Sequence, residues 1–166
     1  PFAALSPLGQ PKADATAARL RDVAPTCAAT AERLRVDAAN VGALLDRAAP
    51  QAVVDAIDDV PAKLALLAEC LRRGLPAWSA MGAARKRDPS ALCVTDLSKT
   101  QVCPLARRVR QGLRALGLER GVRCVWSREP AAPQIPGAPL GSLMPVTASA
   151  GLLLAADVIK SLSSAG

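Results

Sequence analysis

The chain has few aromatic residues and no histidine: its 166 residues include two tryptophans, one phenylalanine and no tyrosine. Hydrophobic residues still make up 51% of the chain, and alanine dominates them, so we expect close packing of helices on a sheet rather than an aromatic core. The five cysteines include no C-x-x-C pair. Because structural zinc sites use closely spaced ligand pairs, we expect no zinc, and the odd cysteine count indicates reduced, intracellular thiols.

A nucleotide-binding G-x-G-x-x-G motif and a long apolar run are also absent. No two of the eleven glycines lie two positions apart. Residues 131–156 carry no charge and contain four prolines, and only residues 146–156 among them can be helical without a break. Such a segment is too short to span a bilayer. Since the first residues also show no leader pattern, we expect a soluble protein without a signal peptide.

Positive charge is concentrated in the middle of the chain. The net charge is +7, and residues 72–128 hold 13 of the 21 lysines and arginines but only 3 of the 14 acidic residues. A basic segment of this kind suits a polyanionic partner, with nucleic acid as the first candidate. The alternative is an ordinary solvated surface in an arginine-rich chain.

Residues 52–100 give the clearest prediction of the fold. Residues 52–57 are mostly apolar, as in a strand covered on both faces; a helix is expected over 61–74, and a second buried strand over 75–81. A strand–helix–strand unit predicts a parallel sheet, whose ligands bind beyond the carboxyl ends of the strands. Asp58 and the basic turn after the second strand lie at that edge.

Periodicity predicts the remaining elements. Helices are expected over residues 11–24, 41–47, 104–116 and 146–162. Strands are expected over 27–36, 92–96 and 123–127. Residues 130–145 are rich in proline and glycine and predict a flexible loop.

Four short segments, in this order, carry a family resemblance: DAID at 55–58, a small-residue and basic turn that ends in DPS at 88–90, DLSKT at 96–100, and CVWS at 124–127. Together they resemble the ThiF/MoeB-like adenylating enzymes, the superfamily that includes ubiquitin-activating enzymes. The branch they resemble most is the tRNA threonylcarbamoyladenosine dehydratases.

The resemblance implies a Rossmann-like α/β fold with a mostly parallel sheet and antiparallel C-terminal strands, and it makes the strand expected over 92–96 antiparallel to the others. Residues 1–166 would form the C-terminal two thirds of a ThiF-type adenylating domain, incomplete at its N-terminal side. The first strand and the glycine-rich nucleotide loop of the family are expected upstream of Pro1. We therefore expect the chain alone to have little activity.

The resemblance also implies the chemistry. ATP would adenylate the carboxylate of threonylcarbamoyladenosine in tRNA, and cyclisation would follow with net loss of water. Lys12 is expected to contact the ATP phosphates, and Asp58 to act as the catalytic residue that helps to hold magnesium-bound ATP, since a carboxylate binds a hard cation. ATP and Mg²⁺ are thus the expected cofactors. The alternatives are an ordinary exposed lysine at Lys12 and a helix cap at Asp58.

Basic residues supply the candidate contacts with tRNA. On the helix expected over 104–116, Arg107, Arg110 and Arg114 share one face, which suits a phosphate backbone. The basic turn and the DLSKT segment supply the other candidates, Arg85, Lys86, Arg87 and Lys99. Simple solvated charge is the alternative for each of them.

Two cysteines carry separate expectations. Cys103 stands where the family has an aspartate as helix cap, and because a thiol caps poorly we expect that helix to fray. Cys124 matches a cysteine that recurs in the dehydratases. Since strand alternation puts it on one face with Trp126, we favour packing in the core over a nucleophilic role.

The resemblance further implies a homodimer. We expect a cytoplasmic location, with an organelle as the alternative. Two other functions stay open. One is an adenylating enzyme for a ubiquitin-like or sulfur-carrier protein, which paired C-x-x-C zinc motifs would have favoured. The other is a non-catalytic remnant that binds tRNA or protein.

Overall fold

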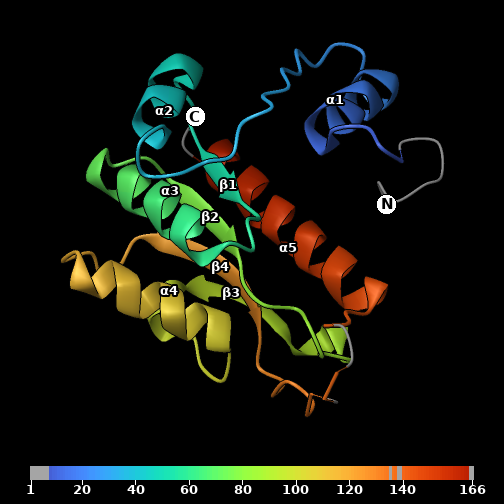
Figure 1. The fold of residues 1–166 in the computed structure, drawn as a ribbon, viewed down its shortest axis with the longest axis vertical. Helices are drawn as coiled ribbons and strands as arrows, with labels where there is room; N and C mark the ends of the chain where they lie inside the picture. The colour runs from blue at the N-terminus through green and yellow to red at the C-terminus, as the bar shows by residue number, and fades with distance from the viewer. Residues whose placement is uncertain (1–7, 135, 138–139, 165–166) are drawn as a thin grey trace. The chain divides into compact units, whose positions relative to one another are not determined.

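The computed structural model describes residues 8–134, 136–137 and 140–164, and it divides into one unit that ends at Arg35 and a second that begins at Val36 (Figure 1). The first unit contains helix α1 (Lys12–Val23). Its surface charges pair locally, since Arg33 donates to Asp14 at 2.7 Å.

The strand predicted over residues 27–36 is wrong. These residues follow an irregular path, and the sheet is made of four other segments. An extended segment becomes a strand only when a neighbour accepts and donates its backbone hydrogen bonds, and none of the described strands pairs with this one.

The second unit is built on a four-stranded sheet in the order β1-β2-β4-β3. Strand β1 (Val53–Asp55) pairs in parallel with β2 (Ala77–Ala80), which pairs in parallel with β4 (Val122–Ser127). Strand β3 (Leu92–Asp96) is antiparallel to β4, with Val94 opposite Val125. The prediction of a mostly parallel α/β sheet with an antiparallel segment at 92–96 is confirmed.

Helices cover both faces of this sheet (Figure 1). They are α3 (Val60–Arg72), α4 (Pro104–Ala115) and α5 (Met144–Ser163), while α2 (Val41–Ala48) packs on α3. Two 3-10 turns are η1 (Pro89–Ala91) and η2 (Leu97–Lys99). Successive residues of the central strands enter opposite cores because strand side chains alternate. Ala77 and Cys124 pack with α3 and α4, whereas Trp78 and Val125 pack with α5.

Helix α4 begins with a sulfur cap. The Cys103 Sγ atom accepts the N–H of Ala106 at 3.5 Å, and the helix is formed from Pro104 onward. The expectation of a frayed start is therefore wrong. Two features explain this: Cys103 is buried, so water does not compete for the Ala106 N–H, and Pro104 contributes no N–H that needs a partner.

Helix α5 is longer than the segment at 146–156 that the sequence analysis judged too short to span a membrane. It continues through Asp157 for 20 residues, and within the described chain it is the one helix long and apolar enough to cross a membrane. In the fold it packs on the sheet instead. Asp157 accepts hydrogen bonds from Trp78 Nε1 at 2.8 Å and from Arg123 Nε at 2.6 Å, which ties the helix to β2 and β4.

The predicted flexible loop at 130–145 lies partly outside the described residues, since 135 and 138–139 are not among them. Its described part is bonded to the turn after β2: Ala132 N–H donates to the Arg85 carbonyl at 2.9 Å, and Arg85 N–H donates to the Gly141 carbonyl at 3.0 Å. The start of α5 at Met144 ends the loop.

Gly121 allows the chain to enter β4. Its φ of 107° is a conformation that L residues rarely adopt, and an added Cβ would lie 2.9 Å from Leu71 Cδ2.

We expect Gly121→Ala to lower the free energy of unfolding by about 1–3 kcal/mol through backbone strain. Gly151→Ala is the matched control: its Cβ would meet nothing within 4 Å in mid-helix, so a gain of up to about 1 kcal/mol is expected. Denaturant unfolding of both proteins measures the difference, and equal stability would contradict the strain argument.

Asp157→Asn is expected to cost about 1–2 kcal/mol of unfolding free energy at pH 7, because its ionised form receives hydrogen bonds from Arg123 and Trp78. The hydrogen bond from Arg123 is the main cause that lowers the pKa of Asp157. A carboxyl with a lowered folded pKa stabilises above its unfolded pKa and loses that effect as the pH falls through the folded pKa. The difference from wild type should therefore vanish in acid. Asp22→Asn removes an exposed pair with Arg19 and should change little.

Candidate functional site

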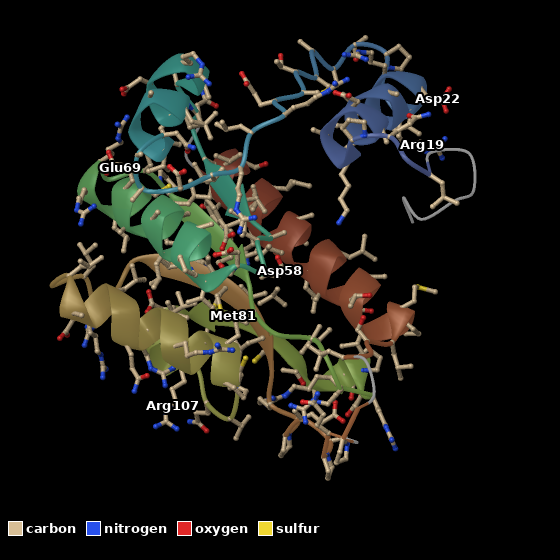
Figure 2. All side chains as sticks on the ribbon, in the orientation of Figure 1. Arg19, Asp22, Asp58, Glu69, Met81 and Arg107 are labelled. Atoms are coloured by element: carbon tan, nitrogen blue, oxygen red, sulfur yellow. The ribbon has the colours of Figure 1, made fainter. Side chains whose placement is uncertain are left out.

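Parallel pairing brings the ends of β1 and β2 to one edge of the sheet. Asp58 lies there in an exposed position, in the turn where β1 leads into α3 (Figure 2). The helix cap is supplied by Asp59, whose Oδ1 accepts the Ala62 N–H at 3.2 Å. The alternative of Asp58 as the cap is thus wrong. Within the described part of the chain, no hydrogen bond or ion pair engages the Asp58 carboxylate. It is free to meet a ligand.

A buried charged cluster lies beneath this turn, and the sequence analysis missed it. The side chain of Lys63 in α3 is fully buried, and its ammonium contacts Asp55 of β1 at 2.5 Å and Ser79 of β2 at 3.0 Å. A signal was present: Lys63 stands at helical spacing with Leu66, Leu67 and Cys70, which are all buried. A lysine on the apolar stripe of a helix indicates a buried partner.

The basic turn after β2 is held by Glu129. The Glu129 carboxylate accepts the backbone N–H groups of Arg87 at 2.9 Å and of Asp88 at 3.1 Å, and these two bonds lower its pKa. Lys86 is buried, and its ammonium donates to the Glu129 carbonyl. Arg85 Nη1 donates to the Ala132 carbonyl at 2.7 Å. Of the three basic side chains in the turn, only that of Arg87 is exposed.

The basic face of α4 lines a groove. Arg107 and Arg108 are exposed, and Arg110 is half-buried with its guanidinium bonded to the Thr100 carbonyl at 3.0 Å. The groove has a volume of about 560 Å³ and is lined by Val102, Cys103, Pro104, Arg107, Arg108, Arg110 and Gln111. Figure 2 shows Arg107 on this helix. A cluster of arginines in a groove can bind phosphate groups.

A second hollow lies near the other end of α4. It has a volume of about 440 Å³ and is lined by Asp96, Ser98, Lys99, Arg114, Glu119 and Arg120. The structure thus brings Lys99 and Arg114 together, and Arg107 and Arg110 together, whereas Arg85 and Lys86 are engaged by the loop at 129–132. The contacts of these six residues and of Arg87 with tRNA stay predictions.

The groove adjoins the sheet edge. Gly82 follows β2, and a Cβ placed on it would lie 3.6 Å from both Cys103 Sγ and Leu105 Cβ at the start of α4. The chain that leaves β2 therefore runs directly past the arginine-lined end of the helix. Neither hollow is lined by Asp58.

Lys12 and Cys124 are the two remaining residues for which the sequence made a prediction. Lys12 is exposed at the first position of α1, in the unit that ends at Arg35, and its contact with ATP stays a prediction. Cys124 is fully buried, and burial raises its thiol pKa to about 12. Because the thiolate is the reactive form, the prediction of core packing for Cys124 is confirmed.

Comparison with known proteins identifies the family. The ThiF family model matches residues 2–166. The chain belongs to the ThiF family.

Within the ThiF family, this chain is similar to proteins named tRNA threonylcarbamoyladenosine dehydratase. It is 39% identical over 127 residues to the one from Bacillus subtilis and 36% identical over 129 residues to the one from Escherichia coli. These alignments cover 76% and 74% of this chain, and 50% and 48% of those proteins. The chain thus spans about half the length of these relatives.

Solved structures of the ThiF-type enzyme from E. coli extend the likeness to the whole fold. The crystal structure of its tRNA N6-threonylcarbamoyladenosine dehydratase, TcdA, in complex with AMP matches with a TM-score of 0.90 at 33% identity, covering 98% of this chain and 68% of that one. The structure of TcdA with ATP matches with a TM-score of 0.89. The expected Rossmann-like fold and the expected family are both confirmed.

The residues of this ThiF chain fit a magnesium–nucleotide complex better than a protein-only metal cage. The described residues contain no group of three or more acidic, cysteine or histidine side chains placed to hold a metal. Mg²⁺ usually takes one or two carboxylates and completes its shell with phosphates and water. The free carboxylate of Asp58 meets that requirement.

Proposed function

We propose that this chain is part of an ATP-dependent tRNA threonylcarbamoyladenosine dehydratase. The observation that carries the proposal is that 98% of the chain superposes on E. coli TcdA, whose solved structures hold AMP and ATP. The named relatives from bacteria support the same activity. We also propose a cytoplasmic location, because tRNA is present in the cytoplasm.

The proposed reaction begins when a carboxylate oxygen of threonylcarbamoyladenosine attacks the α-phosphorus of ATP, which releases pyrophosphate. The resulting acyl adenylate has a good leaving group, so a nucleophile within the same modified base closes the ring and expels AMP. Asp58 would bind the Mg²⁺ that neutralises the phosphates. Lys12 is the lysine proposed to contact ATP phosphates.

The arginine-lined groove of α4 would take the RNA. Its arginines present guanidinium groups that bind phosphate oxygens in pairs of hydrogen bonds. It lies beside the end of β2, so a phosphate backbone in the groove would run close to the sheet edge that carries Asp58. Lys99, Arg114 and Arg120 would extend this basic surface along the helix.

A second copy of the chain would cover α5. Its outward side exposes Leu152 at 73% and Ile159 at 64%, which is a large apolar surface for one helix. This observation supports the proposed homodimer.

Binding of ATP–magnesium tests the nucleotide part of the proposal. We expect the purified chain to release or absorb heat on titration with ATP–magnesium, and Asp58→Ala to weaken the affinity at least about tenfold because a carboxylate ligand is lost. Asp22→Ala removes an exposed carboxylate from α1 and serves as control. Absence of binding in the wild-type chain would favour the non-catalytic alternative.

Salt-dependent binding of tRNA tests the α4 groove. Arg107→Gln together with Arg108→Gln should weaken tRNA binding and reduce the slope of log affinity against log salt by about 1 to 2, because each lost phosphate contact releases about one counterion fewer. Arg72→Gln removes an exposed arginine from α3 and should leave the slope unchanged. An unaltered slope in the α4 variant would place the RNA elsewhere.

A further inference from the structure

Three elements meet in one buried polar cluster at the edge of the sheet that carries Asp58. The Lys63 ammonium donates to Asp55 Oδ2 at 2.5 Å, to Ser79 Oγ at 3.0 Å and to the Ala80 carbonyl at 3.1 Å. The Ser79 hydroxyl in turn donates to Asp55 Oδ2 at 2.5 Å. All three ammonium protons therefore have acceptors, and the cluster joins α3 to the ends of β1 and β2.

One hydrogen bond leads out of this cluster. Asp55 Oδ1 accepts the backbone N–H of Ile57 at 2.9 Å, and Ile57 is the residue that precedes Asp58. On the other side of Asp58, Asp59 is fixed by its cap bond to Ala62. The free carboxylate of Asp58 thus extends from a short turn whose two flanking residues are both held by side-chain hydrogen bonds.

Stability alone does not account for this buried pair. Lys63 and Asp55 are both fully buried, and removing two such charges from water costs about as much as their attraction returns. Apolar residues of similar volume commonly stabilise such a site as well or better. What apolar residues cannot do is hold the Asp55 carboxylate in the one orientation in which its second oxygen meets the Ile57 N–H.

We propose that Lys63 is a positioning residue: by fixing the Asp55 carboxylate it holds the turn at Ile57 and so directs the carboxylate of Asp58 towards its ligand. The functional meaning of this arrangement rests on the proposed binding of magnesium–ATP by Asp58. The local ordering of the turn does not, because it depends only on contacts within the chain.

Two double variants separate the parts of this network. Asp55→Asn with Lys63→Met removes both charges but keeps a side-chain oxygen that can accept the Ile57 N–H. Asp55→Val with Lys63→Met removes both charges and that oxygen. Neither variant leaves a buried charge without its partner, which is the usual reason for such single variants to unfold.

Amide hydrogen exchange by NMR is the first measurement. Relative to reference amides in β4, the Ile57 amide hydrogen should exchange at least about tenfold faster than in wild type in both variants. In the valine variant the acceptor at position 55 is absent, and in the asparagine variant the ammonium of Lys63 no longer fixes the side chain that carries it. The valine variant gives the exchange rate expected when the hydrogen bond from the Ile57 N–H to the side chain at position 55 is lost completely. Wild-type exchange at Ile57 in the asparagine variant would overturn the proposal, since Lys63 would then be unnecessary.

Titration with ATP–magnesium is the second measurement. Both variants should bind at least about tenfold more weakly than wild type while the reference amides keep their protection. Unchanged affinity beside faster exchange would overturn the positioning role. A wild-type chain that binds no ATP–magnesium would overturn the proposed function of Asp58, and the exchange rates would still decide whether Lys63 orders the turn.

Discussion

Parallel pairing of β1, β2 and β4 is the constraint on which the rest of the second unit depends. Parallel strands need crossover helices, and α3 and α4 fill the space over one face while α5 covers the other. The same pairing brings the ends of β1 and β2 to one edge. The candidate nucleotide residue Asp58 and the start of the basic groove are near that edge because of this geometry.

Polar groups in this unit act mainly by holding turns. Glu129 binds the backbone of Arg87 and Asp88, and Asp55 binds that of Ile57. Each carboxylate accepts N–H groups that a tight turn leaves without partners in the sheet or a helix. On α4, by contrast, the exposed Arg107 and Arg108 line a groove. Arg85 and Lys86 thus hold the loop at 129–132, whereas Arg107 and Arg108 face outward.

Sequence reasoning succeeded where the signal is local. The strand–helix–strand unit at 52–81 and the strand at 92–96 follow from periodicity and from proline and glycine placement, and the structure contains them. The antiparallel direction of 92–96 came from the family resemblance. Sequence reasoning failed for residues 27–36, which have no paired neighbour among the described strands. It also failed for the thiol cap, since burial of Cys103 depends on packing.

The sequence by itself determined the order of the helices and strands from residue 41 onward, the family and the placement of Asp58 after a strand. Only the tertiary structure decided which charges are available. Lys86 reaches a carbonyl 43 residues away and is buried, and Lys63 meets Ser79, 16 residues away, inside the core. Sequence periodicity predicts on which face of a helix or strand a residue lies. What covers that face comes from distant segments, so the partner of a charge is known only once the chain has packed.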